Sequence, residues 1–326
     1  MTYHVPVMPE ETAQYLVNDE KGFYVDCTLG GGGHSEYLLK KFPGIKILGL
    51  DRDEEAVKFA KERLSRFAGR IFIAKGNFKD IGSLAVTHDG SVGESPDQNP
   101  PAGAASRNIL LNSSDQKASA VMTAFSNGVQ GFLLDLGISS RQVDEPGRGF
   151  SFRSQSLDMR MDRGEGLSAQ DLVNSAPEEE LSRIFFEYGE ERKSRQIARA
   201  IVEERSRAAI TSADRLTEIV SRAKWAGGRI NPATLVFQAL RIAVNGELEN
   251  LQDALAQMPR MLAGAGRIVT ISYHSLEDRI IKRAFLGAEE AGQLKVITKK
   301  VVRAEFTEIR ENPRSRSAKL RCAQKA

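Results

Sequence analysis

The chain has only two cysteines, Cys27 and Cys322, among its 326 residues. Two cysteines cannot build a disulfide framework or a cysteine-rich zinc site, and we predict no metal site. No apolar run approaches the ~18 residues that a membrane span needs. The first residues also lack the basic start and apolar core of a secretory signal. These absences predict a cytoplasmic protein without a membrane partner, and they leave its oligomeric state open.

Composition otherwise resembles that of a soluble globular protein, with 41% hydrophobic and 27% charged residues, which excludes wholesale disorder. The net charge of +3 is unevenly distributed. Residues 279–326 hold 13 Lys and Arg against 5 Asp and Glu, whereas the rest of the chain is slightly acidic. A basic end favours a polyanionic partner such as nucleic acid, although a solvated surface would look the same.

Short apolar segments alternate with helical patterns in the first third of the chain. Strands are predicted at residues 23–29, 46–50 and 70–74, with helices from Ser35 and over residues 53–67. Strands interleaved with helices indicate βαβ units and a parallel sheet.

Two segments interrupt this alternation. Residues 85–128 are rich in Ala, Ser, Asn, Gly and Pro, which predicts a flexible insertion with a weak helix near residues 117–125. After a buried strand at residues 131–137, no strand pattern appears between about 140 and 230. We therefore predict a doubly wound sheet domain made of residues 1–140 and 231–326, with residues 141–230 as an inserted helical domain.

A long amphipathic helix is predicted after Pro232. Its apolar residues would share one side: Val236, Leu240, Val244, Leu248, Leu251 and Leu255.

The chain has a run of four glycines, Gly30–Gly33, between the first strand and its helix. Glycines there let the backbone approach a ligand, and the helix N-terminus offers unpaired N–H groups. The third glycine of a dinucleotide motif is missing, and so is the G-K-[ST] of a P-loop. Asp26, just before the glycines, suits a cofactor with a cationic amine better than one with a pyrophosphate.

Further candidate cofactor contacts follow the next strands. Asp51 ends the second strand and could accept both hydroxyls of a ribose, while Asp53 is expected to cap the following helix. Phe78 could flank an adenine face. Asp135 ends the fourth strand at the ligand edge of the sheet, unless it is only a cap. Among adenosine cofactors with a charged tail, S-adenosylmethionine fits best; a nicotinamide cofactor, and hence an oxidoreductase, is the less favoured alternative.

Several sequence blocks, spread over nearly the whole chain, belong together. They are H-V-P-V-M at 4–8, D-C-T-L-G-G-G-G-H-S at 26–35, L-L-D-L-G-I-S-S-R-Q at 133–142, R-G-F-S-F at 148–152, L-D-M-R-M-D at 157–162, Y-G-E-E-R at 188–192, F-Q-A-L-R-I-A-V-N at 237–245, S-Y-H-S-L-E-D-R at 272–279 and N-P-R-S-R-S-A-K-L-R at 312–321. With these blocks the chain resembles one known family, the bacterial small-subunit ribosomal RNA cytosine-N4 methyltransferases of the RsmH/MraW type.

The resemblance implies an α/β fold, the class I S-adenosylmethionine-dependent methyltransferase with a Rossmann-like doubly wound sheet and an inserted α-helical domain. It implies methylation of N4 of one cytidine in the decoding region of 16S rRNA, within the small ribosomal subunit. It also implies these cofactor contacts: Gly32, Gly33, His34, Asp51, Phe78, Asp135 and Gln142. A non-catalytic rRNA-binding assembly factor is the alternative function.

Two residues are candidates for the chemistry at N4. Asp135 could accept a hydrogen bond from the amino group near the methyl donor, or only orient the cofactor. His274 follows a strand at the same sheet edge and could take the released proton, although a lone histidine is often structural. Neither cysteine follows the fourth strand, which argues against methylation at C5.

Basic residues interleaved with aromatic ones are candidates for RNA binding. Arg148, Phe150 and Arg153 form one group, although core packing is an alternative for the phenylalanine. Arg314 and Arg316 form a second group near the C-terminus, continued by Lys319 and Arg321.

Overall fold

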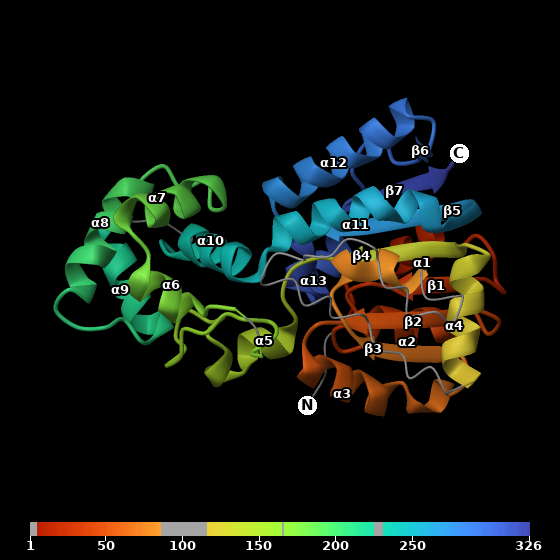
Figure 1. Cartoon of the computed structure of the whole chain (residues 1–326), viewed down its shortest axis with the longest axis horizontal. Coiled ribbons are helices and arrows are strands. Elements are labelled where there is room, and N and C mark those ends of the chain that lie inside the picture. Colours follow the sequence, from red (N-terminus) through yellow and green to blue (C-terminus); the bar gives the residue numbers. More distant parts are fainter. Residues whose placement is uncertain (1–4, 86–115, 165, 225–230) are drawn as a thin grey trace, which may run out of the picture. The chain divides into compact units, whose positions relative to one another are not determined.

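The computed structural model describes residues 5–85, 116–164, 166–224 and 231–326 (Figure 1). The chain forms two compact units. The sheet unit comprises Met1–Gly137 and Glu249–Ala326, and the helical unit comprises Ile138–Leu248. No helix in the described part of the chain is long and apolar enough to cross a membrane.

The sheet unit contains a sheet of seven strands, in the order β3-β2-β1-β4-β5-β7-β6. The first five in this order run parallel, and β7 is antiparallel to both β5 and β6. The strands are β1 (Phe23–Asp26), β2 (Lys46–Asp51), β3 (Ile71–Lys75), β4 (Val129–Asp135), β5 (Leu262–Ser272), β6 (Leu294–Val296) and β7 (Lys319–Lys325). The reversal of strand order on either side of β1 makes the sheet doubly wound, as predicted.

Helices cover both faces of this sheet (Figure 1). One face packs against α1 (Pro9–Leu16), α2 (Gly33–Lys41) and α3 (Glu54–Arg63). The other packs against η2 (Phe78–Ala85), α4 (Gln116–Ser126), α11 (Glu247–Met261) and α12 (Ser275–Glu290). The central strands are therefore buried on both sides, which explains their continuous apolar runs.

The predicted flexible insertion is shorter than expected at its C-terminal end. The weak helix expected near residues 117–125 is α4, and its Val121 and Phe125 are buried in the core. Packing against the sheet therefore removes residues 116–128 from the predicted insertion, and the rest of it, residues 86–115, lies outside the described residues.

The helical unit has an apolar core of its own, formed without any strand of the sheet. Its elements are α5 (Ser140–Asp144), η4 (Pro146–Arg148), α6 (Ala169–Ser175), α7 (Glu178–Glu187), α8 (Ser194–Arg205), α9 (Ala213–Lys224) and α10 (Thr234–Asn245). Ser168 caps α6, where its hydroxyl accepts from the Asp171 N–H at 3.1 Å.

The predicted long helix after Pro232 is wrong, because the structure has two helices there. Gly246 ends α10 in the left-handed conformation, with φ of 57°, and α11 begins directly after it. A positive φ cannot continue a right-handed helix. Val236 and Leu240 of α10 are buried in the core of the helical unit, so the predicted domain boundary at residue 231 moves to residue 248.

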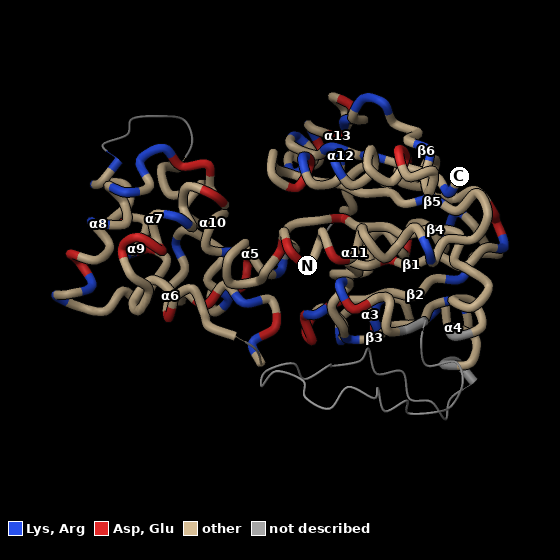
Figure 2. Tube along the Cα trace, turned by 45° about the horizontal axis from the view of Figure 1, so that its top comes forward, with Lys and Arg blue, Asp and Glu red and all other residues tan. Residues whose placement is uncertain are grey.

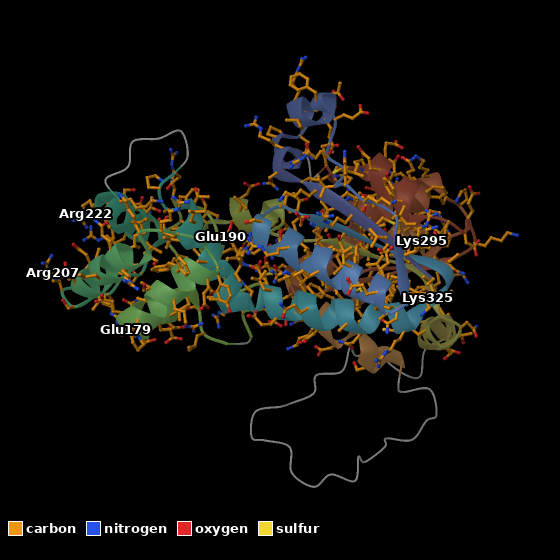
Figure 3. The ribbon with its side chains drawn as sticks, turned by 90° about the horizontal axis from the view of Figure 1, so that it is seen from above. Glu179, Glu190, Arg207, Arg222, Lys295 and Lys325 are labelled. Atoms are coloured by element: carbon orange, nitrogen blue, oxygen red, sulfur yellow. The ribbon has the colours of Figure 1, made fainter. Side chains whose placement is uncertain are left out.

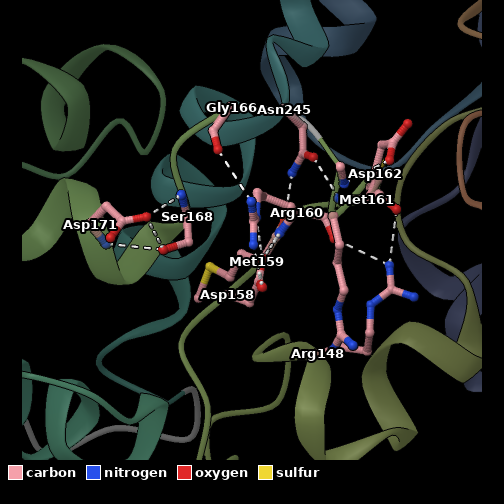
Figure 4. Close-up of polar contacts among 12 residues, drawn as sticks. Arg148, Asp158, Met159, Arg160, Met161, Asp162, Gly166, Ser168, Asp171 and Asn245 are labelled. Atoms are coloured by element: carbon pink, nitrogen blue, oxygen red, sulfur yellow. Dashed lines mark hydrogen bonds and ion pairs between the residues drawn. The ribbon is translucent and has the colours of Figure 1, made fainter.

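A polar cluster fixes the loop that precedes α6 (Figure 4). The Asn245 side chain accepts from the Met161 N–H at 2.8 Å and donates to the carbonyl oxygen of Met159 at 2.8 Å. Met159 has a positive φ of 58°, a conformation that costs a non-glycine residue free energy. The buried amide of Asn245 therefore holds a strained turn in place.

We expect Asn245→Ala to lower the free energy of unfolding by about 2–4 kcal/mol, because it leaves buried backbone groups without partners. Chemical denaturation followed by circular dichroism measures the change. Gln196→Ala, at an exposed position of α8, is the matched control and should stay within about 0.5 kcal/mol of the parent. Equal destabilisation by both substitutions would contradict this role of Asn245.

Candidate functional site

Three carboxylates end neighbouring strands of the sheet. Asp26 is the last residue of β1, Asp51 of β2 and Asp135 of β4, and these strands are adjacent in the order β2-β1-β4. Because the strands are parallel, their carboxyl ends meet at one edge, beside the point where the strand order reverses. The structure therefore brings together the acidic side chains that the sequence singled out.

The glycine run lies at this edge and has room for a ligand. Gly30 and Gly32 have φ values of +49° and +75°, which favour glycine. A Cβ at Gly32 would lie 2.9 Å from Cδ1 of Leu64, whereas a Cβ at Gly30 would meet nothing closer than the Thr28 carbonyl oxygen at 3.9 Å. The loop is thus packed on one side and open on the other.

The first turn of α2 follows this loop, since Gly32 is its N-cap and Gly33 and His34 begin the helix. The first N–H groups of a helix have no partner within it. A ligand in the open side of the loop can therefore meet backbone donors as well as carboxylates, which fits a cofactor with a cationic amino acid tail and a ribose.

Asp51 is held by the backbone of the loop. Its two carboxyl oxygens accept from the Gly30 N–H at 2.7 Å and the Asp53 N–H at 2.9 Å. Burial raises the pKa of Asp51 to about 6, although these two hydrogen bonds oppose the shift. Asp53 caps α3 through the Glu55 N–H, as predicted.

Asp26 is more deeply buried than Asp51. It accepts from the Ser35 hydroxyl at 2.7 Å and from the Thr28 N–H at 3.3 Å. Burial raises the pKa of this carboxyl to about 6 as well. Near neutral pH both groups are mostly ionised, and both become protonated over the same mildly acidic range.

His34 lies between the N-terminal segment and Asp135. Its Nε2–H donates to the Val7 carbonyl oxygen at 2.8 Å, so the neutral ring carries its proton on that nitrogen. Nδ1 lies 3.5 Å from Oδ2 of Asp135. Burial lowers the pKa of His34, which favours the neutral ring. An unprotonated nitrogen therefore faces the Asp135 carboxyl and can accept a proton that this carboxyl takes up.

Tyr273 is the residue of this site that the sequence did not single out. Its hydroxyl donates to Oδ1 of Asp135 at 2.7 Å. Burial and the neighbouring carboxylate raise the pKa of Tyr273 well above its usual range, so the hydroxyl keeps its proton. One signal could have found it: Ile271 pairs with Asp135 across β4 and β5, and Tyr273 is two residues later, on the same side.

His274 follows β5 at the predicted edge of the sheet. It caps α12, where Nδ1 accepts from the Glu277 N–H at 3.4 Å and Nε2 lies 3.2 Å from the Glu277 carboxylate. Adjacent residues leave a strand in opposite directions, so Tyr273 reaches Asp135 and His274 turns to the helix end. His274 thus caps α12, and its role as the proton acceptor at this edge stays a prediction.

Comparison with known proteins agrees with this geometry. The family model described as the MraW methylase family matches residues 1–326. The chain belongs to the MraW methylase family. This membership confirms the predicted methyltransferase fold class. It also confirms the predicted cofactor, S-adenosylmethionine.

Three curated relatives carry the name ribosomal RNA small subunit methyltransferase H. The protein of Endomicrobium trichonymphae is 46% identical, with 99% of each chain covered. Those of Coprothermobacter proteolyticus and a Nostoc species are each 42% identical; each match covers 99% of this chain, and 96% and 92% of the respective relative. These matches extend over both units of the structure.

Two further predicted cofactor contacts remain predictions in this methylase. Phe78 begins η2 directly after the loop that follows β3, and its half-buried ring packs against the core. The loop is tied to β2, because the Gly76 N–H donates to the Asp51 carbonyl oxygen at 2.9 Å. Gln142 belongs to the helical unit, where its side chain accepts from the Ser139 N–H at 3.0 Å.

The predicted RNA contacts around residues 148–153 are partly wrong. Arg148 is only 2% exposed and donates to the carbonyl oxygens of Arg160 and Met161 at 3.2 and 3.1 Å (Figure 4). Phe150 is buried in the core of the helical unit. Both side chains therefore stabilise the fold, and of this group only Arg153 is exposed.

The basic residues near the C-terminus also differ in their surroundings. Arg314 and Arg316 are exposed in η5 (Pro313–Ser317) and stay predicted RNA contacts. Arg321 is buried and pairs with Asp278 at 2.7 Å, and Lys319 lies 3.7 Å from the same carboxylate. The last two cations therefore share one carboxylate of the fold, which offsets part of their charge.

We expect the affinity for adenosine to fall by up to about tenfold between pH 7 and pH 5, because ribose hydroxyls donate more strongly to an ionised Asp51, whose pKa is about 6, than to its protonated form. Adenosine has no cationic tail, so Asp26 does not contribute. Calorimetric titration at several pH values measures the change. Asp51→Asn should bind adenosine more weakly and without this pH dependence; a flat profile for the unaltered protein would refute the ribose contact.

We expect Tyr273→Phe to lower the methyl-transfer rate constant by about 10- to 100-fold, because it removes a hydrogen bond to a charged group. Affinity for S-adenosylhomocysteine should stay within about threefold, since the hydroxyl only orients Asp135. Tyr37→Phe, on α2, is the control and should change neither quantity. A parallel loss of cofactor affinity would instead indicate a structural role for Tyr273.

Proposed function

We propose that this protein transfers a methyl group from S-adenosylmethionine to N4 of a cytidine in the decoding region of 16S rRNA, acting on the small ribosomal subunit in the cytoplasm. The observation that carries the proposal is the Asp135 carboxyl, which accepts a hydrogen bond from Tyr273 and lies 3.5 Å from Nδ1 of His34, at the edge where the glycine loop lies. The relatives named ribosomal RNA small subunit methyltransferase H support the substrate class.

The proposed cofactor site uses the edge residues in distinct ways. Gly32, Gly33 and His34 offer backbone donors at the start of α2, and Asp51 accepts the ribose hydroxyls. Asp26 balances the cationic tail, and Phe78 flanks the adenine. When bound, S-adenosylmethionine supplies an electrophilic methyl carbon on a sulfonium.

Asp135 addresses the weak nucleophilicity of the cytosine amino group. The lone pair of N4 is delocalised into the ring, and an acceptor for the N4–H favours its localisation on nitrogen. The Tyr273 hydroxyl donates to Oδ1 of Asp135 and thereby fixes the plane of the carboxyl. A carboxylate held in this way can accept the N4–H without reorganising during the reaction.

The same residues provide a path for the proton that N4 must lose. As the N4–C bond forms and the S–C bond breaks, N4 acquires positive charge and releases one proton to Asp135. Nδ1 of His34, 3.5 Å from Oδ2, can then accept that proton, because its own N–H is on Nε2. Carboxyl and ring together can hold the proton until it exchanges with water.

The thiols support an amino-group target over C5 of the ring. Methylation at C5 commonly requires a cysteine thiolate that attacks C6. Burial raises the pKa of Cys27 well above its usual range and that of Cys322 to about 12. Neither of the two cysteines can therefore supply a thiolate near neutral pH.

The test uses small subunits from cells that lack this protein. After incubation with the protein and labelled S-adenosylmethionine, mass spectrometry of the nucleosides should show N4-methylcytidine in 16S rRNA. Asp135→Asn should lower the transfer rate about 100- to 10,000-fold, because the amide cannot take the proton. Asp253→Asn, at an exposed position of α11, is the matched control.

Two results would contradict the proposal. Label on C5, or on a base other than cytosine, would refute the N4 assignment. No label at all, from protein that binds S-adenosylhomocysteine and small subunits, would favour a non-catalytic assembly factor.

A further inference from the structure

Phe306 is the most exposed large hydrophobic side chain among the described residues, at 77%. It is the first residue of α13 (Phe306–Glu311). An exposed phenylalanine forgoes the stabilisation that burial of its ring would contribute. The ring belongs to neither apolar core of the described sheet unit, so it is accessible to a ligand.

One face of α13 packs against the protein and the other faces solvent. Glu308 accepts from the Met8 N–H at 2.7 Å, and Ile309 packs against the apolar core. Phe306 and Arg310 are four residues apart, hence neighbours on the exposed face. The solvent face of α13 therefore pairs an aromatic ring with a guanidinium group.

Further exposed cations lie near α13 in the sequence. Lys299, Lys300, Arg303, Arg310 and Arg316 are exposed, and none of them forms an ion pair within the described residues. Figure 2 shows Lys and Arg gathered around α12, α13 and β6. The C-terminal segment thus carries positive charge that the fold itself does not neutralise.

In the helical unit, by contrast, several arginines share one carboxylate. There Arg207, Arg215 and Arg222 surround Glu204 at 3.6, 2.6 and 3.3 Å, and two of these arginines are labelled in Figure 3. Its most exposed phenylalanine, Phe186, lies next to the ion pair of Arg183 and Glu187 in α7. Phe306 differs, because the cation four residues after it, Arg310, forms no ion pair within the described residues.

Hydrogen bonds connect α13 to the candidate site. Glu308 and Asn312 bind the backbone of Met8 and Val5, and the carbonyl oxygen of Val7, within the same segment, accepts from His34. This N-terminal segment therefore contacts both α13 and the first turn of α2, which follows the glycine loop. A strand of RNA that enters the ligand edge would therefore pass within reach of α13.

We propose that Phe306, Arg310 and Arg316 form an accessory site for single-stranded RNA, in which the ring stacks on an unpaired base and the guanidinium groups bind phosphates. The inference rests on the proposed function, since the RNA would be the strand that flanks the target cytidine. Glu305 and Glu311, both exposed, border this face. They make it a poor match for a uniformly anionic membrane surface, whereas a strand can place its phosphates around them.

The first test measures binding of an unstructured, fluorescein-labelled oligouridine of about 12 nucleotides, by anisotropy, to the full chain. Phe306→Ala should raise Kd about five- to 150-fold, the loss expected for one stacked base, and Phe306→Trp should restore binding. Phe186→Ala, 62% exposed in the parent, is the matched control and should leave Kd unchanged. With an abasic oligonucleotide, Phe306→Ala and the parent should bind alike.

The second test separates phosphate contacts from stacking. Arg310→Ala and Arg316→Ala should each reduce the slope of log K against log salt by about 0.7, whereas Phe306→Ala should leave it unchanged. Arg260→Ala, an exposed position just before β5 at the opposite edge of the sheet, is the charge control. Unchanged melting temperature and S-adenosylhomocysteine affinity establish that each variant is folded.

The inference is overturned if Phe306→Ala binds the oligouridine like the parent, or if it changes only self-association or binding to anionic vesicles. A failure of the proposed function would give a different experimental result. In that case the parent protein transfers no methyl group to N4 of cytidine in small subunits, while the oligouridine titrations still support or overturn the accessory site.

Discussion

The site depends on buried carboxylates at the carboxyl edge of the parallel sheet. A buried carboxylate costs free energy unless hydrogen bonds replace its lost hydration. Asp51 obtains them from the N–H groups of Gly30 and Asp53, and Asp26 from the Ser35 hydroxyl and Thr28. The glycine loop is therefore partly shaped by the acids it faces, and its positive φ values are the conformation that these contacts require.

The same constraint explains why one edge can bind a cofactor and also support chemistry. Asp135 sits on a buried strand end, so its position is rigid, and its neighbours differ in proton affinity. Tyr273 keeps its proton and donates, whereas the neutral ring of His34 can accept one. A carboxyl between a permanent donor and a potential acceptor is suited to take a proton briefly and pass it on.

The cationic side chains fall into two groups, one buried and one exposed, with different roles. Arg148 and Arg321 are almost fully enclosed, and they satisfy carbonyl oxygens and a carboxylate of the fold. Arg310 and Arg316 are exposed and lack such partners within the described residues. Only cations of the second kind can contribute fully to the attraction of RNA, because paired charges have already been neutralised.

Features that depend on neighbours along the chain could be predicted from the sequence: the strand–glycine–helix unit, the acids at strand ends, the Asp53 cap and the family motifs. Which side chains meet at the carboxyl edge of the sheet, and which arginines are buried, depends on the tertiary structure. Tertiary structure also decided that Gly246 divides the expected long helix, so that α10 packs in the helical unit. Those outcomes depend on side-chain direction and on packing between segments distant in sequence, and a local pattern contains neither.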